Sequence, residues 1–309
     1  MNKSCFNLFF CVSKVLRVLA VSGLLVGLIG VTPSRADIII DGYTAQTNDR
    51  FTNHASFIAA DFNLSGVGQA SNGRWATAIS RNVIISANHF RPTGTITFFE
   101  TNDPNGNFVT RTVVSGIKVP NTDLYLGVLD SFLPGSIVHY SFATEPLSGP
   151  EGTLVSAGIY QGMNAYLFGR SPETQASNRD HAVGRNRISG YLENVDFAGN
   201  SDNDALLLIY DSPGDPNYVD FEAYLQSGDS GGPLFVDIDG EFRLMGTNAF
   251  INSGGINNPP VFSGINYTGN QTEFINDFII QSIPEPSALV ILMTTAVILI
   301  PRRRRSVSP

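Results

Sequence analysis

The stretch Gly-Asp-Ser-Gly-Gly-Pro-Leu-Phe-Val occupies residues 228–236, where a glycine-rich turn leads into an apolar run. A nucleophilic serine needs its hydroxyl on a tight turn, with backbone N–H groups near the oxyanion that develops during attack. Glycine on both sides of Ser230 permits such a turn and the close approach of a substrate backbone. An ordinary glycine-rich loop between two strands is the alternative. Ser230 is therefore a candidate nucleophile, and it requires a base elsewhere in the chain.

Two further segments carry a candidate base and a candidate acid. Val83–His89 reads as a strand of mainly apolar residues that ends in a histidine, and Asn121–Leu129 carries Asp123 at the start of another apolar run. An acid that holds the far nitrogen of the imidazole fixes its tautomer and stabilises the imidazolium. Asp130, at the end of the same run, is the competing acid. The other histidines have no such context and are expected to be structural or surface residues: His54, His139 and His181.

Together these segments resemble the trypsin-like family of serine proteases. Val83–His89 is similar to the family's strand ending in Ala-Ala-His, with Asn88 in place of the second alanine, and Phe90 replaces a usual cysteine. Asn121–Leu129 is similar to its Asn-x-Asp-Ile-Ala-Leu-Leu strand. The order His, Asp, Ser also fits this family rather than subtilisin-like enzymes or α/β-hydrolases. The resemblance covers about residues 70–280 and implies Ser230 as nucleophile, His89 as general base and Asp123 as orienting acid.

Between residues 37 and 283, short β-branched and aromatic runs alternate with Gly, Asn, Asp and Pro, which predicts an all-β barrel or sandwich. Helical spacing predicts one helix over Thr272–Gln281, capped by Asn270 or Thr272. The resemblance implies two antiparallel six-stranded β-barrels, over 37–145 and 146–283, with the catalytic groups between them. The predicted strands are Trp75–Ile79, Val83–Ser86, Thr95–Phe99, Phe108–Val114, Thr153–Ala157, Ala205–Tyr210, Pro233–Val236 and Phe242–Gly246, with turns at Asp103-Pro-Asn-Gly and Asp239-Gly.

The resemblance also implies the surroundings of the nucleophile. The backbone N–H groups of Gly228 and Ser230 would form the oxyanion hole. Tyr224, Phe250 and Ile251 would form the substrate pocket, with Tyr224 in place of the aspartate at the floor of the trypsin pocket. Without that carboxylate, cleavage after Lys or Arg is not expected. Ile251 falls near a small glycine of the family and would narrow the pocket.

An activation step is a further implication. The segment Ile39-Ile40-Asp41-Gly42 is similar to the Ile-Val-Gly-Gly that begins mature enzymes of the family, in which the freed amine pairs with the aspartate before the nucleophile, here Asp229. A buried carboxylate needs such a partner. Two residues, Asp37 and Ile38, would first have to be removed. The alternative is that this segment is simply the first β-strand.

The first 36 residues resemble a secretory signal peptide. Basic residues precede the apolar run Val18–Val31, which ends near the small residues around Ala36. An N-terminal anchor helix is the alternative, although the run is short for a membrane span. Export from the cytoplasm is therefore expected.

The last 26 residues, 284–309, resemble the PEP-CTERM sorting tail of Gram-negative bacteria. Pro284-Glu285-Pro286 precedes the apolar run Ser287–Ile300 and the block Arg302–Arg305. An arginine block after an apolar stretch favours transient membrane association with the arginines inside. The resemblance implies removal of the tail by an exosortase-type enzyme and a location in the periplasm, at the cell surface or in the extracellular matrix. A permanent tail anchor is the alternative.

Composition narrows the remaining possibilities. Both cysteines, Cys5 and Cys11, lie in the signal segment, so the rest of the chain has no disulfide or thiolate chemistry. Residues 37–283 contain 26 acidic and 11 basic residues, a net charge of −15 that argues against nucleic acid as a partner. The histidines lack metal-ligand spacing, and no metal or other cofactor is expected. The expectation is an exported serine endopeptidase acting on proteins or peptides; a protease fold retained for binding, and an esterase, are the alternatives.

Overall fold

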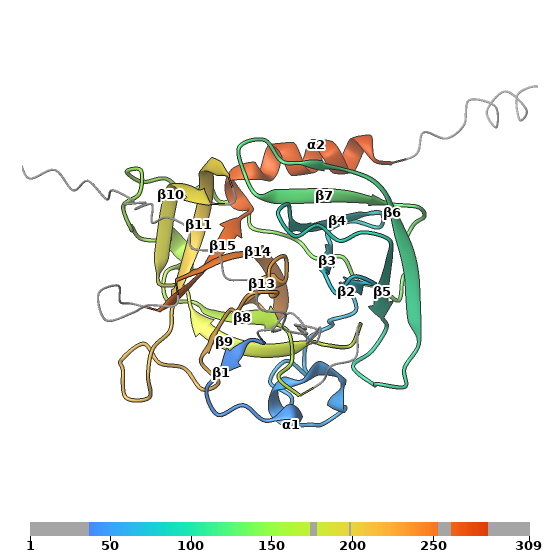
Figure 1. The fold of residues 1–309 in the computed structure, drawn as a ribbon, viewed down its shortest axis with the longest axis horizontal. Coiled ribbons are helices and arrows are strands. Elements are labelled where there is room, and N and C mark those ends of the chain that lie inside the picture. Colours follow the sequence, from blue (N-terminus) through green and yellow to red (C-terminus); the bar gives the residue numbers. More distant parts are fainter. Residues whose placement is uncertain (1–36, 174–177, 198, 253–260, 284–309) are drawn as a thin grey trace, which may run out of the picture. The chain divides into compact units, whose positions relative to one another are not determined.

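The structure, a computed structural model, describes residues 37–173, 178–197, 199–252 and 261–283. These residues form mainly β-strands, with one ten-residue helix, α2 (Thr272–Gln281), near their C-terminal end (Figure 1). The all-β class and the C-terminal helix expected from the sequence are confirmed. Both terminal segments expected to be a signal and a sorting tail lie outside the described residues. Within the described part of the chain, no helix has the length and apolar character needed to cross a membrane.

Six strands form a closed barrel in the order β2-β3-β4-β7-β6-β5. In β4, Val83 and Ile85 pack into one hydrophobic cluster and Ile84 into another, so both faces of the strand are buried. A strand buried on both faces reads as an unbroken apolar run, which is why this segment shows no alternation. The bounds are β2 Val67–Ala70, β3 Trp75–Ala78, β4 Val83–Ala87, β5 Thr95–Phe99, β6 Phe108–Lys118 and β7 Leu124–Leu129.

A second sheet has seven strands in the order β10-β11-β15-β14-β13-β8-β9. Strands β9 and β10 lie at opposite edges of this order, yet only Ile188 and Ser189 separate them along the chain. The sheet must therefore curl until its edges meet, and the Ser189 N–H donates to the Leu207 carbonyl of β11 at 2.8 Å. The bounds are β8 Asn164–Gly169, β9 Ala182–Arg187, β10 Gly190–Phe197, β11 Asn200–Ile209, β13 Pro233–Ile238, β14 Glu241–Asn252 and β15 Phe262–Tyr267.

This strand number differs from the six-stranded barrel expected for the second half. The bend at Ile188 and Ser189 divides one extended stretch into β9 and β10, which gives the sheet its seventh strand. The predicted strand over Thr153–Ala157 is also wrong: Val155 makes only an isolated bridge to Tyr191, and a 3-10 turn, η2 (Gly158–Tyr160), follows. The expected Asp239-Gly turn does join β13 to β14, with both residues at positive φ.

Helix α2 has the predicted bounds but not the predicted cap. Its N-cap is Gln271, which makes no side-chain capping bond, and it follows the short η3 (Gly269–Gln271). Asn270 instead bonds the backbone N–H and carbonyl of Leu147, and the Thr272 hydroxyl donates to the Gly269 carbonyl. Ile275 is buried in the cluster that also holds residues of the barrel, so the helix covers that cluster.

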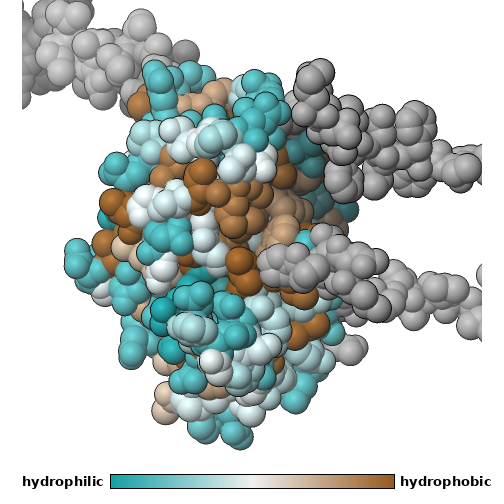
Figure 2. All heavy atoms as spheres, turned by 90° about the vertical axis from the view of Figure 1, so that its left-hand side faces the viewer, coloured by the Kyte–Doolittle hydropathy of each residue, from teal (hydrophilic) through white to brown (hydrophobic). Residues whose placement is uncertain are grey.

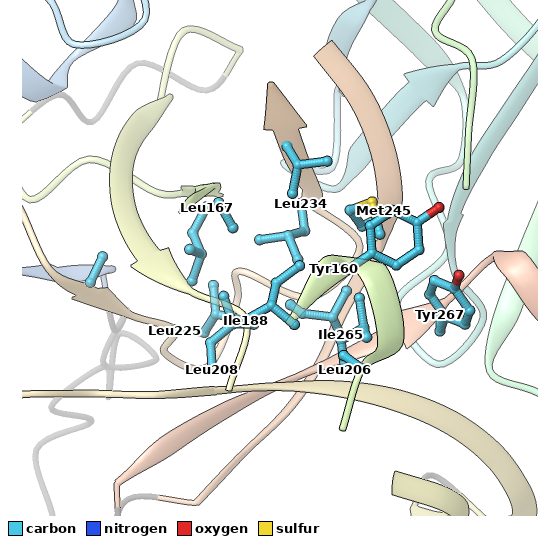
Figure 3. Packing of buried hydrophobic residues seen from close by; sticks show 14 of the residues in the cluster. Tyr160, Leu167, Ile188, Leu206, Leu208, Leu225, Leu234, Met245, Ile265 and Tyr267 are labelled. Atoms are coloured by element: carbon cyan, nitrogen blue, oxygen red, sulfur yellow. The ribbon is translucent and has the colours of Figure 1, made fainter. Parts of the chain in front are cut away.

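The second sheet has its own core, shown in Figure 3. Leu167 of β8, Leu234 of β13, Met245 of β14 and Ile265 of β15 point toward one another there. Another cluster combines side chains of the barrel with side chains of this sheet, including Trp75, Leu124, Phe168 and Phe235. The barrel and the sheet therefore pack against each other through shared apolar residues.

The segment before the barrel crosses to the second sheet. Strand β1 (Ile39–Ile40) pairs antiparallel with β12 (Ala223–Tyr224). The short helix α1 (Ala45–Asn48) and the 3-10 turn η1 (Arg50–Thr52) follow. All strands of the barrel lie between residues 37 and 145 and those of the seven-stranded sheet between 146 and 283. Strand β1, in its separate two-stranded sheet with β12, adds a further contact between these two parts of the chain.

One face of the molecule carries hydrophobic residues grouped between hydrophilic margins (Figure 2). This face corresponds to the left of Figure 1, where β10 lies. Leu154, which lies next to Gly190 of β10, is 46% exposed. The surface on this side is thus less polar than the acidic composition alone predicts.

Candidate active site

Ser230 lies in the turn that leads into β13. Gly228 and Gly231 on either side of it adopt φ angles of 106° and 84°, which favour glycine. At Gly231 a Cβ would also lie 2.5 Å from the Ser86 hydroxyl, so a larger residue would collide with the end of β4. The glycines shape the turn, as the sequence predicted, and Gly231 also lets it approach the barrel closely, which was not predicted.

His89 and Asp123 come together because they follow and precede neighbouring strands. Ala87 at the end of β4 is opposite Leu124 at the start of β7. The Asp123 Oδ2 lies 2.5 Å from His89 Nδ1, and its Oδ1 accepts the His89 backbone N–H at 2.8 Å. The carbonyl of Asp123 accepts the Asn88 N–H at 2.6 Å. Asp123 is fully buried. These three hydrogen bonds hold the segment that carries His89 against Asp123.

The other ring nitrogen of His89 faces the serine. His89 Nε2 lies 2.9 Å from Ser230 Oγ. The Asp123 carboxylate accepts hydrogen bonds, so the arrangement that satisfies every group places the imidazole hydrogen on Nδ1 and leaves Nε2 to accept from Ser230. The His89 side chain is 30% exposed, which leaves the serine side of the ring open to solvent. The three candidate residues therefore form one continuous hydrogen-bonded chain.

The competing residues lie elsewhere. Asp130 is exposed at the opposite end of β7, where it accepts from the Ser131 hydroxyl. His54 and His139 are exposed; the ring of His54 contacts Ser56. His181 is buried beside Trp75, and burial together with the charge of Arg50 lowers its pKa well below the ordinary value. None of these four takes part in the hydrogen-bonded chain around Ser230.

In the turn over residues 228–232, two backbone N–H groups have no acceptor in the part of the chain that the structure describes. The N–H groups of Asp229, Gly231 and Gly232 donate to the carbonyls of Gln226, Asn248 and Asp229. Among the described residues, the N–H groups of Gly228 and Ser230 donate to none. These are the two groups predicted to form the oxyanion hole, and they are available to an external acceptor.

A cavity of about 290 Å³ adjoins Ser230. Phe250 and Ile251 line it, as predicted, but Tyr224 does not. Side chains alternate along β12, so Ala223 points into the core and the ring of Tyr224 packs 5.5 Å from that of Tyr210 instead. The complete lining is Leu225, Gln226, Ser227, Ser230, Asn248, Ala249, Phe250 and Ile251.

Several of these lining residues were not anticipated. Leu225, Gln226 and Ser227 follow Tyr224 directly. The sequence located this segment near the cavity but did not show which of its residues face it. Asn248 has its side-chain amide committed to the carbonyls of Phe168 and Asp229. The described wall of the cavity contains no acidic or basic side chain.

Asp229 is fully buried beneath the loop. Its carboxylate accepts the backbone N–H groups of Arg170 at 2.7 Å and Gln226 at 2.8 Å. Burial raises its pKa to about 7; the two N–H bonds and the charge of Arg170 act in the opposite direction, and the charge of Asp37 adds to the rise. The partner that the resemblance implied for Asp229 is the freed amine of Ile39; in the uncut chain this nitrogen belongs to a peptide bond, so the pairing stays a prediction.

Strand β1 shows which isoleucine lies next to Asp229 in the uncut chain. Ile39 is 42% exposed, whereas Ile38 and Ile40 are buried in the core of the second sheet. Ile38 is the residue beside Asp229, because a Cβ on Gly169 would lie 2.6 Å from Ile38 Cβ and 2.9 Å from Asp229 Cγ. The segment serves as a β-strand, the alternative that the sequence left open.

Within the described residues, no group of three or more His, Cys, Asp or Glu side chains is arranged to hold a metal ion. Neither a protein-family model nor a curated protein sequence matches the chain.

Proposed function

We propose that the protein is a serine endopeptidase. The observation that supports this most directly is the chain from Asp123 through His89 to Ser230, with bonds of 2.5 and 2.9 Å. A serine hydroxyl is a weak nucleophile alone and becomes effective next to an oriented imidazole. The two N–H groups without an acceptor in the same loop supply the second requirement, a place for the oxyanion.

The chemistry follows from these roles. Ser230 Oγ attacks the scissile carbonyl carbon while His89 Nε2 takes the hydroxyl proton, and the oxyanion binds the N–H groups of Gly228 and Ser230. Collapse breaks the C–N bond as His89 returns the proton to the leaving amine. Water then attacks the acyl-enzyme with His89 again as base, which releases the acid and regenerates Ser230. Asp123 stays ionised throughout and stabilises the imidazolium.

A free strand edge favours a peptide over a small ester. Strand β13 pairs with β14 only as far as Thr247, whereas β14 continues to Asn252. Among the described strands, none pairs with this side of residues 249–251, close to the cavity at Ser230. An extended peptide can add to such an edge through backbone hydrogen bonds. Side activity on esters is compatible with the same triad.

The cavity is suited to bind an uncharged substrate side chain, that of the residue before the scissile bond. Leu225, Ala249, Phe250 and Ile251 form its apolar wall. A lysine or arginine side chain would be desolvated there without a carboxylate partner, which is costly. Specificity for basic residues is therefore not proposed.

Labelling and substitution test the proposal. A fluorophosphonate probe should label native protein at Ser230 and not heat-denatured protein. Ser230→Ala and His89→Ala should each lower peptide hydrolysis by roughly 10³-fold or more while leaving the fold intact by circular dichroism. His54→Ala, a histidine outside the hydrogen-bonded chain, is the control and should retain activity. Equal hydrolysis by Ser230→Ala and wild type would end the assignment, and peptide binding without labelling would favour a protease fold kept for binding.

The proposed place of action is outside the inner membrane. The signal-like residues 1–36 and the Pro-Glu-Pro tail support export followed by processing by an exosortase-type enzyme. Intact mass of protein from the native host should then show a chain ending near residue 284. A mature product that retains Arg302–Arg305 would support a permanent anchor instead.

A further inference from the structure

The loop with the two available N–H groups depends on a buried carboxylate. Asp229 is inaccessible to solvent, and a buried charge is costly unless hydrogen bonds and an opposite charge compensate it. Its two oxygens accept one backbone N–H each, from Arg170 and from Gln226. Its own carbonyl accepts the Asn248 side-chain amide at 3.0 Å and the Gly232 N–H at 3.1 Å. The position of Ser230 is thus tied to the residue that precedes it.

Arg170 supplies the opposite charge. This residue follows β8 directly, and its guanidinium lies against the loop: Cζ and Nε would each be 3.5 Å from a Cβ on Gly228. The Nη2 donates to the carbonyl of Gly73, in the turn between β2 and β3, at 3.0 Å. Its charge lowers the pKa of Asp229 against the effects of burial and of Asp37. The Arg170 side chain therefore contacts Gly228 of the proposed oxyanion hole, donates a hydrogen bond to the barrel and lowers the pKa of Asp229 through its charge.

The segment around β1 completes the support with Asp37 still attached. The Ile38 N–H donates to the Arg170 carbonyl at 3.1 Å, and the Ile38 side chain packs beside Asp229 across Gly169. The pairing of β1 with β12 holds the next two residues. With Asp37 still attached, both oxygens of Asp229 already accept backbone N–H groups and Arg170 supplies an opposite charge, so the carboxylate is compensated without a freed amine.

We propose that Arg170 is a positioning residue for the loop from Gly228 to Ser230, and that hydrolysis requires no freed amine at Ile38 or Ile39. This rests on the proposed function, because the loop matters only if Ser230 is acylated. Two experiments on the full chain test the two halves of the inference.

The first experiment reads the N-terminus of active molecules. Full-length protein is labelled with a biotinylated fluorophosphonate, captured, and analysed by N-terminal mass spectrometry. Chains that begin at Asp37 or earlier should be among the labelled molecules. The inference is overturned if every labelled molecule begins at Ile38 or Ile39.

The second experiment removes the positive charge of Arg170. Arg170→Gln should lower kcat roughly 10- to 100-fold with KM changed less than about threefold, since the loss affects the oxyanion site. Arg170→Lys, which keeps the charge, should recover part of kcat. Arg185→Gln is the matched control: it is another partly buried arginine, stacked on Tyr166, and should leave kcat unchanged.

A titration separates failure of the inference from failure of the proposed function. In protein with ¹³C-labelled aspartate, the Asp229 carboxyl signal is assigned by its loss in Asp229→Asn. Arg170 and Asp37 are the side chains whose charges act on this group. Its pKa should rise in Arg170→Gln relative to wild type, whether or not the protein hydrolyses peptides. Wild type that resists the probe would contradict the proposed function; a labelled wild type whose kcat and Asp229 pKa are both unaffected by Arg170→Gln would contradict only the inference.

Discussion

Asp123 and Asp130 lie just outside opposite ends of β7 and offer a matched test of the acid. Asp123→Asn keeps the shape of the side chain but allows the wrong imidazole tautomer, so kcat should fall by about 10⁴-fold. Asp130→Asn changes an exposed residue and should leave kcat within about twofold of wild type. Peptide hydrolysis by both purified variants checks this. A larger loss in Asp130→Asn than in Asp123→Asn would assign the acid to the other end of the strand.

At this scale the sequence was informative where a residue's role depends on its immediate neighbours. His89, Asp123 and Ser230 each stand in a short string that also defines the local strand or turn, and the structure brings the three together. Tyr224 was misplaced because its role depends on which face of the two-residue strand β12 points inward. That choice is made by the pairing of β1 with β12, a contact between residues far apart in the chain.

Among the elements, β14 shapes the cavity, and this leads to a specificity prediction. Ile251, 39% exposed, is one wall residue that can be shortened without opening the core. Wild type should cleave peptides with leucine before the scissile bond better than those with lysine or glutamate. Ile251→Gly should raise the kcat/KM ratio of phenylalanine over leucine roughly tenfold, since one methylene or more of pocket volume is worth about this factor.

The measurement uses a peptide series that differs only in that residue. Ile159→Gly, which removes an equally branched but 66% exposed side chain in η2, is the control and should leave the ratio unchanged. Best cleavage after lysine, or the same ratio in Ile251→Gly and wild type, would show that this cavity does not receive the substrate side chain.

Most strands and α2 were predictable because hydrophobic pattern and turn residues are local signals. The Asp239-Gly turn and the run Val83–Ser86 belong to this class. The seventh strand of the second sheet was not predictable, because it arises from a bend at Ile188 whose partner, the Met163 carbonyl, is distant in sequence. Thr153–Ala157 has strand-like composition, but positive φ at Gly152 and Gly158 confines it to a single bridge.

For the whole molecule, buried acids set how stability depends on pH. Glu222 is fully buried and accepts the backbone N–H groups of Val219 and Asp211. Burial, assisted by the charge of Asp211, raises its pKa from 4.5 to about 7, although those bonds and the charge of Arg187 oppose the rise. The folded protein therefore binds this proton more tightly than the unfolded chain does. The pKa of Asp229 is also raised, to about 7, so this carboxyl likewise binds its proton more tightly in the folded protein.

Stability from these groups should be greatest below about pH 5 and should be lost as the pH rises toward 8. The free energy of unfolding in urea should fall by roughly 1 to 3 kcal/mol for Glu222 across that range. Glu222→Gln cannot ionise, so its unfolding free energy should depend less on pH, whatever its absolute stability. Glu151→Gln, at an exposed position, should follow wild type. If Glu222→Gln and wild type show the same slope between pH 5 and 8, the carboxyl of Glu222 is not the group that couples folding to protons.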